Sequence, residues 1–172
     1  MEDITINLTL KEINHNDSLE GLKFLQKLVN EEGIMVAPAP KDISESTYGD
    51  WLQSKEDMAK GINLPEGFIP CTTYWVMLDD KIIGLANIKH YLNYFLRKKG
   101  GHIGLSLAKN YRNKGLGLRV TKLLIEKARN EFGIEDILLT NEPKNIASRK
   151  LCEKLGAELT DIDEHCHYWL RK

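Results

Sequence analysis

Several features that mark whole classes of protein are scarce or missing in this 172-residue sequence. No uninterrupted apolar run approaches the roughly 20 residues that cross a bilayer, and the acidic start, Met1 to Asp3, is not followed by the apolar region of a secretory signal. The 24 basic and 25 acidic residues leave a net charge of -1, so the chain has no overall field for nucleic acid or an anionic membrane. We therefore expect a cytoplasmic protein without nucleic-acid or membrane partners.

Cysteine is also scarce, with three residues at Cys71, Cys152 and Cys166. An odd, scattered set suits reduced thiols better than a disulfide framework, in agreement with a cytoplasmic location. Repeats and low-complexity segments are missing as well, and the length suffices for one domain with a real core but hardly for two. We expect residues 1–172 to form a single domain.

The most informative stretch is a short basic turn, Arg112 to Gly117, between a predicted strand and a predicted helix. Ile103 to Ala108 is apolar enough for a buried strand, and Leu118 to Phe132 carries apolar residues at helical spacing. Such a turn directs several backbone N–H groups and the positive end of the helix dipole at one point, and its glycines let a ligand approach the main chain. The stretch therefore predicts a site for a phosphate group.

Two common phosphate-binding motifs do not fit this turn. The nucleoside-triphosphate loop, Gly-x-x-x-x-Gly-Lys-Ser/Thr, is missing, and so is the three-glycine dinucleotide motif. Arg112-x-x-Gly115-x-Gly117 instead resembles the acetyl-CoA signature, Arg/Gln-x-x-Gly-x-Gly/Ala, of the GNAT superfamily of acyl-CoA-dependent N-acetyltransferases. Asn145 to Ala157 resembles the family's next motif, in which an Asn opens a helix. The resemblance runs from about Thr72 to Leu170 and is strongest to a bacterial branch of predicted acetyltransferases.

The resemblance implies an α/β fold, called α+β in some schemes, with a mixed, mostly antiparallel central sheet of six to seven strands flanked by about four helices. From periodicity and turn residues, strands are expected at 4–10, 72–78, 82–88, 103–108, 137–140, 158–162 and 166–170, and helices at 19–29, 46–60, 118–132 and 145–155. Gly33 is expected to end the first helix. Residues 92–101 are expected to form a loop, in which Arg97 to Gly101 is either a solvated turn or a contact for phosphate or acceptor.

The resemblance also implies how acetyl-CoA, the co-substrate, is bound. Two central strands diverge, and the pantetheine arm lies between them and pairs with the main chain of the first. The glycine turn then holds the pyrophosphate. The residues implied in cofactor binding are Leu105, Ser106, Leu107, Arg112, Asn113, Lys114, Gly115, Leu116, Gly117, Asn145 and Ser148.

The proton donor to the departing thiolate is not the family's usual residue. In many members a Tyr seven residues after the motif's Asn gives this proton, and that position is Cys152 here. A thiol with an unperturbed pKa of about 8.5 could act as the acid, or it could pack in the helix as a small buried side chain. The sequence leaves both alternatives open.

The general base has several candidates. Relatives often carry Glu or His at the position of Gly101, and the neighbouring His102 should point to the opposite face. His102 is one candidate for the base, His90, Tyr91 and Glu142 are others, and a relay of water to bulk solvent could also serve.

A metal site is not expected. His165 and His167 would lie on one face of a strand, but they supply only two ligands, and no third residue follows at a convincing spacing. A solvated strand is the simpler interpretation.

These inferences predict an enzyme that transfers an acetyl group from acetyl-CoA to a primary amine by direct attack in a ternary complex. Trp51, Phe68 and Tyr74 either line the acceptor pocket or belong to the core. A non-catalytic acyl-CoA-binding or sensing module is the alternative, and a purely structural domain is a third hypothesis. The acceptor's identity and the formation of a homodimer stay open.

Overall fold

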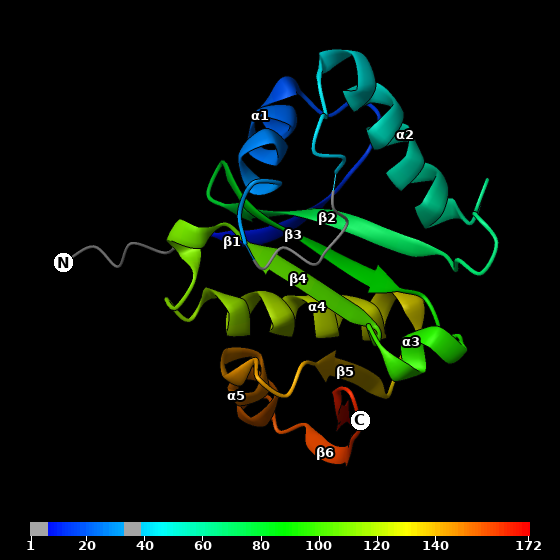
Figure 1. The fold of residues 1–172 in the computed structure, drawn as a ribbon, viewed down its shortest axis with the longest axis vertical. Coiled ribbons are helices and arrows are strands. Elements are labelled where there is room, and N and C mark those ends of the chain that lie inside the picture. The colour runs from blue at the N-terminus through cyan, green and yellow to red at the C-terminus, as the bar shows by residue number, and fades with distance from the viewer. Residues whose placement is uncertain (1–6, 33–38) are drawn as a thin grey trace.

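The computed structural model describes residues 7–32 and 39–172 of the protein (Figure 1). The strands are β1 (Leu8–Glu12), β2 (Cys71–Leu78), β3 (Lys81–Lys89), β4 (Ile103–Leu107), β5 (Ile137–Asn141), β6 (Glu158–Ile162) and β7 (Cys166–Leu170). The helices are α1 (Leu19–Leu28), α2 (Glu45–Lys60), α3 (Tyr94–Lys98), α4 (Leu116–Phe132) and α5 (Ile146–Lys154), with a 3-10 turn, η1, at Lys109–Tyr111. Among these residues no helix is both long and apolar enough to cross a membrane.

The seven strands form two hydrogen-bonded groups. One is a four-stranded antiparallel sheet in the order β1-β2-β3-β4, and the other is a three-stranded antiparallel sheet in the order β5-β7-β6. Helix α4 connects the last strand of the first group to the first strand of the second, and β4 and β5 run in the same direction (Figure 1). This confirms the predicted α/β fold, with the difference that the central sheet is divided between β4 and β5.

The two faces of the four-stranded sheet carry different helices. Helices α1 and α2 lie on one face and α4 lies on the other (Figure 1). Because successive residues of a strand point to opposite faces, Trp75 and Leu85 are buried with α1 and α2, whereas Tyr74 and Ala86 are buried with α4. Each face therefore has its own hydrophobic core.

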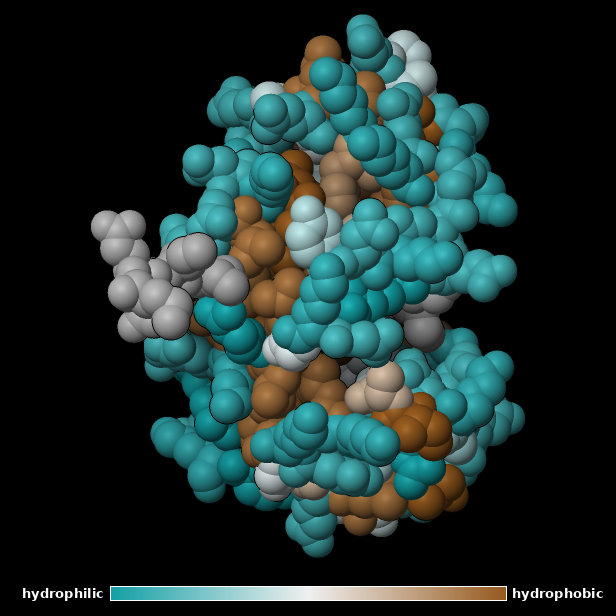
Figure 2. Space-filling model, turned by 90° about the vertical axis from the view of Figure 1, so that its left-hand side faces the viewer, coloured by the Kyte–Doolittle hydropathy of each residue, from teal (hydrophilic) through white to brown (hydrophobic). Residues whose placement is uncertain are grey.

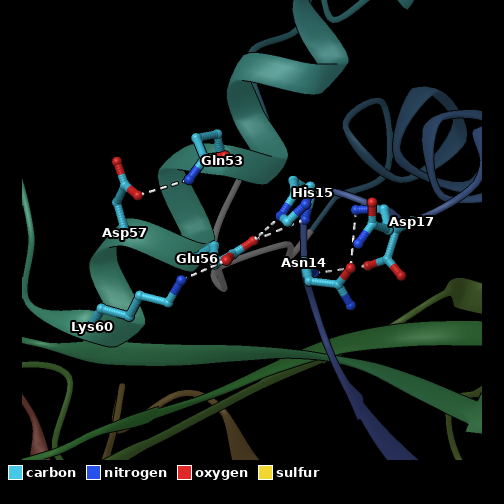
Figure 3. A network of polar contacts seen from close by, with 8 residues as sticks. Asn14, His15, Asp17, Gln53, Glu56, Asp57 and Lys60 are labelled. Atoms are coloured by element: carbon cyan, nitrogen blue, oxygen red, sulfur yellow. Dashed lines mark hydrogen bonds and ion pairs between the residues drawn. The ribbon is translucent and has the colours of Figure 1, made fainter.

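Helix α2 is fixed over the sheet by packing and by polar contacts. Gly21 of α1 permits the close approach, because a Cβ at this position would overlap the Tyr48 hydroxyl of α2. Figure 3 shows the polar part, in which Glu56 Oε2 accepts from His15 N over 3.1 Å and contacts His15 Nδ1 over 2.6 Å, while Lys60 Nζ donates to Glu56 Oε1 within α2. The two contacts with His15 are exposed and individually weak, but together they hold α2 beside the segment that follows β1.

Most predicted boundaries differ from the structure by at most a single residue, and the larger differences are the following. Helix α3 lies where a loop was expected, because the Asn93 side chain accepts a hydrogen bond from Leu96 N over 2.8 Å and caps a single helical turn. Helix α1 ends at Leu28, before Gly33, which lies outside the described residues. Strand β1 runs to Glu12 because it pairs with β2 as far as Tyr74, and residues 4–6 of the predicted strand also lie outside the described residues. Helix α4 begins two residues earlier than predicted.

Candidate active site

Among the described residues, the backbone of β5 is hydrogen-bonded to His102, the residue just before β4. His102 N donates to Leu138 O over 2.9 Å, and His102 Nδ1 accepts from Leu138 N over 2.9 Å. Beyond this point, in the part of the chain that the structure describes, Ile103–Leu107 forms ladder hydrogen bonds with β3 alone. No described strand therefore pairs with the edge of β4 that faces β5, which is the open edge that the resemblance implied for the strand that pairs with pantetheine, and Arg112 Nε occupies only the Leu107 carbonyl at its end.

Gly101, just before this junction, leaves no room for a catalytic side chain. Its φ is 58°, and a Cβ here would overlap the Leu138 carbonyl oxygen. Glycine is required by both the backbone conformation and the close approach of β5. The position at which relatives often carry a Glu or His is thus used here to join the two strands.

The start of α4 presents unpaired backbone donors. Gly115 is the N-cap residue, with a φ of 75°, and it provides no side-chain cap. The first turn of the helix also has no acidic residue, so nothing in it offsets the positive end of the dipole. The N–H groups of Leu116, Gly117 and Leu118 have no acceptor within the helix, as in any first turn. This arrangement suits an anion such as a pyrophosphate.

Helix α5 packs against the start of α4. A Cβ added to Gly117 would lie 3.4 Å from Leu151 Cδ1, in the second half of α5. Asn145 is the N-cap of α5, and its Oδ1 accepts from Ser148 N over 3.1 Å. The Asn145 carbonyl oxygen is thus used by the helix itself, and its Nδ2 has no hydrogen-bond partner among the described residues.

The Arg112 side chain is used within the protein. Its Nε donates to Leu107 O over 2.8 Å, its Nη1 donates to Glu32 O over 3.0 Å, and its Nη2 contacts Glu31 Oε2 over 3.2 Å. The guanidinium therefore fastens the end of β4 to the segment after α1. Asn113, with a φ of 58°, and exposed Lys114 complete the turn.

The structure brings the three groups of predicted cofactor residues together. Strand β4 holds Leu105, Ser106 and Leu107, α4 follows it after one short turn, and α5 packs against the start of α4 through Leu151. Figure 2 views the molecule from the side on which α4 begins and shows hydrophobic surface in a hollow between the part with α1 and α2 and the part with α5. An apolar hollow with backbone donors at one end suits a long thioester cofactor.

Cys152 is buried in the core of the α4 side. It is 2% exposed, and Asn141 Nδ2 lies 3.4 Å from its Sγ. Burial raises the pKa of this thiol to about 12, so it stays protonated at neutral pH. The same burial makes it a poor proton donor, because the charged form is disfavoured.

The candidate bases lie in different places. Burial, together with the charges of Lys89 and Arg97, lowers the pKa of His102 to about 4, and its Nδ1 already accepts from Leu138 N. His90 contacts Phe132, at the far end of α4, with ring centroids 4.4 Å apart. Tyr91 is exposed, and Glu142 pairs with Lys144 over 3.2 Å.

One further sequence expectation needs correction, and one pair of alternatives is resolved. His165 precedes β7, and His167 is buried and paired with Asp163, so they do not share the face of a strand. Among the described residues no group of three or more His, Cys, Asp or Glu could hold a metal. Of the three aromatic residues, Trp51 and Tyr74 are buried in the two hydrophobic cores, as the core alternative predicted, and Phe68 is exposed.

A family model for the acetyltransferase (GNAT) domain matches residues 7–158. The chain belongs to this family. It is similar to an uncharacterized N-acetyltransferase, YobR, of Bacillus subtilis, with 31% identity over 104 residues. That match covers 60% of this chain but 38% of the relative, so the chain spans well under half of that protein's length.

Solved structures of acetyltransferases share the fold. The Campylobacter jejuni N-acetyltransferase PseH in complex with acetyl-CoA has a TM-score of 0.65 and 13% identity, over 96% of this chain and 99% of PseH. An acetyltransferase from Agrobacterium tumefaciens has a TM-score of 0.66 and 16% identity, over 100% and 97% of the two chains. A dodecameric spermidine N-acetyltransferase from Vibrio cholerae has a TM-score of 0.64 and 15% identity, over 95% and 93%.

Sequence reasoning did not find one set of polar residues near the junction of β4 and β5. Thr73 and Asn87 are buried opposite each other on β2 and β3, on the face that α2 covers. The sequence carries one weak signal: Thr73 lies two positions from Trp75, and Asn87 lies two positions from Leu85, so each polar residue shares a strand face with a large apolar residue. That signal has no meaning until the register of the two strands is known.

Proposed function

We propose that this protein transfers an acetyl group from acetyl-CoA to a primary amine by direct attack in a ternary complex. The observation that carries the proposal is the uncapped start of α4 at the end of the open edge of β4. Backbone donors at the helix would hold the pyrophosphate, and the strand edge would hold the pantetheine. Acetyl-CoA supplies the activated acyl group, and the PseH structure supports the same fold as a binder of that ligand.

The main chain would supply most of the catalysis. A free N–H on the open edge of β4 can donate to the thioester oxygen as negative charge develops on it. The neutral amine then forms the new C–N bond, the C–S bond breaks, and the amine's proton ends on the CoA thiolate. Cofactor contacts would come from the residues that the sequence predicted, with Arg112 acting through its backbone since its side chain is occupied.

The two predicted catalytic side chains have weaker support. A Cys152 thiol with a pKa of about 12 would have to give its proton to a thiolate that is the weaker base, with a reference value of about 8.5. A His102 imidazole with a pKa of about 4 is a poor acceptor for an ammonium proton. We therefore expect water to carry the protons and keep both residues as candidates for testing.

A second candidate function is binding of acyl-CoA without transfer. Gly101 has no side chain to act as a base, and Cys152 is buried with a raised pKa. A sensing module would need the cofactor site but no acid or base, which matches these two positions.

The proposal is tested by calorimetry with acetyl-CoA and by release of CoA from acetyl-CoA in the presence of a panel of primary amines. We expect binding, and at 100 times its dissociation constant the ligand should add about 2.7 kcal/mol to the free energy of unfolding. Binding without CoA release for any amine would favour the sensing module. No binding heat and no change in melting temperature would contradict both functions.

A further inference from the structure

A band of polar side chains crosses the sheet on the face that α2 covers. Cys71 pairs with Lys89, and Lys89 N donates to His102 O over 2.8 Å, so one row crosses β2, β3 and the start of β4. The next row consists of Thr73, Asn87 and Gly104. Paired residues of antiparallel strands share a face, and this face is the one that buries residues with α2. The first row ends at the junction with β5, beside the open edge of β4.

Two buried polar atoms in this region have no hydrogen-bond partner among the described residues. They are Asn87 Oδ1, on a residue that is 8% exposed, and Trp51 Nε1, on a residue of α2 that is 7% exposed. A buried polar group without a partner destabilises the folded protein. A polar ligand that supplied the missing hydrogen bonds would remove this cost.

Two partly buried lysines lie beside these atoms. Lys55 follows Trp51 by one turn of α2, with its Nζ 5.4 Å from the centroid of the indole ring, and Lys89 follows Asn87 by two residues on β3. Neither lysine forms an ion pair within residues 7–32 and 39–172. Burial lowers the pKa of both, and only the Cys71 thiol opposes this.

These lysines therefore lack a counter-charge within the described part of the chain. Burial raises the pKa of Cys71, so its thiol is neutral and cannot serve as one. On the neighbouring α3, the exposed Arg97 adds another positive charge near His102. Burying a cation partly away from water raises the free energy of the folded protein unless an anion pairs with the cation.

We propose that Lys55 and Lys89 bind the anionic group of the acceptor, which is then a primary amine that also carries a carboxylate or a phosphate. The inference rests on the proposed function, since it assigns the acceptor side of the same site. The lysine row meets β4 at His102, three residues before Leu105, which is about 10 Å along a strand. An extended lysine side chain covers much of this distance, and a small acceptor covers the remainder. One small molecule can therefore contact the lysines with its anionic group and the thioester with its amine. A polyamine, by contrast, would meet charges of its own sign.

Matched amines test the charge preference. The assay compares CoA release with glucosamine 6-phosphate against glucosamine, and with glycyl-phenylalanine against its amide, with spermidine as a cationic acceptor. We expect kcat/KM to be about tenfold or more higher for the anionic member of at least one pair, in line with a charge-assisted hydrogen bond. The pair that shows the preference identifies the anion as phosphate or carboxylate.

Lysine variants test the residues. Lys55→Met and Lys89→Met keep the alkyl stem and remove the charge, and each should abolish the preference through KM with little change in kcat. Lys23→Met, at an exposed lysine of α1, is the matched control and should keep the preference. Equal turnover of anionic and neutral acceptors by the wild type, or an unchanged preference in both variants, would overturn the proposal.

A binding measurement decides the matter if no amine in the panel reacts. Melting temperatures are compared in phosphate or succinate and in chloride at equal ionic strength, with and without saturating CoA. The anions should raise the melting temperature of the wild type and of Lys23→Met more than that of a Lys55→Met/Lys89→Met protein. Equal rises in all three proteins would contradict the lysine site. If the anions stabilised the wild type more than the double variant but the wild type did not bind acetyl-CoA, the proposed function would be contradicted and the lysine site would not.

Discussion

The two sides of the four-stranded sheet offer ligands different kinds of group. On the α4 side, the candidate cofactor site consists of backbone donors at Leu116–Leu118 and the open edge of β4. On the α2 side, the candidate acceptor site consists of side chains, chiefly Asn87, Lys55 and Lys89. In a backbone site the φ and ψ angles position the N–H donors, so the site tolerates most changes of side chain. In a side-chain site a single substitution can change which ligand is bound.

This difference also explains how visible each site is in the sequence. A backbone site of this kind needs glycine at fixed offsets, as at Gly115 and Gly117, so it leaves a motif. A side-chain site on a sheet is assembled by the register of strands, and its members lie far apart along the chain. Variants on each side test whether the two sites function separately.

The largest effect is expected at the start of α4. Gly115→Val should weaken acetyl-CoA binding at least a thousandfold, about 4 kcal/mol, because a β-branched residue does not accept a φ of 75° and the turn would redirect its N–H groups. Calorimetry with acetyl-CoA measures the loss. A side-chain site would not depend on this backbone angle.

Gly133 provides a matched control for that variant. It ends the same helix with a φ of 64°, and at both glycines no other atom lies within 4 Å of the place that a Cβ would take. Gly133→Val should therefore cost comparable stability and leave acetyl-CoA affinity nearly intact. Equal affinity losses in the two variants would mean that folding strain, and not the phosphate site, explains the effect.

The second effect concerns His102, where the two sides meet. Its pKa is about 4 in the folded protein, below the ordinary value of 6.5, so between these pH values the unfolded chain binds a proton that the folded chain does not. The free energy of unfolding should be unaffected by His102 above pH 6.5 and should fall by up to about 3 kcal/mol as the pH drops to 4.

Urea unfolding at pH 7, 5.5 and 4.5 measures this dependence. His102→Gln keeps an acceptor for Leu138 N but has no ionisable group, so its curve should be flatter than that of the wild type. Other acids titrate in both proteins, and the difference between the two curves isolates His102. Parallel curves would show that the imidazole is not buried in a neutral form.

The third effect concerns Cys152 on the α4 side. Cys152→Ala should lower the free energy of unfolding by about 2 kcal/mol, because it leaves a small cavity and removes the contact with Asn141. CoA release by the folded variant should change little. Cys166→Ala, at a fully buried thiol of the same core, is the control for the cavity. A hundredfold rate loss in Cys152→Ala alone would identify its thiol as the acid.

The sequence was sufficient for most of the fold because the strands are apolar runs between turn residues and the longer helices have a clear apolar face. The mostly buried β2 and β3 and the amphipathic α4 were predicted with small boundary errors. Helix α3 was missed because five residues are too few for a helical repeat, and it depends on the Asn93 cap. The join at Gly101 was also invisible, because the carbonyl of Leu138 that excludes a side chain belongs to β5, far along the chain.

The smallest effect is expected at Arg112, the first residue of the cofactor motif. Its side chain contacts Leu107 O, Glu32 O and Glu31 rather than facing the start of α4, and the ion pair with Glu31 is partly exposed. Arg112→Ala should therefore cost about 1 kcal/mol of stability, and less than about threefold in acetyl-CoA affinity, below 1 kcal/mol. Glu31→Gln weakens the same contact from the other partner and should give a similar, smaller loss of stability. Calorimetry and urea unfolding on both variants separate the roles: a tenfold loss of affinity in Arg112→Ala at unchanged stability would place the guanidinium on the ligand and make the cofactor site depend on a side chain after all.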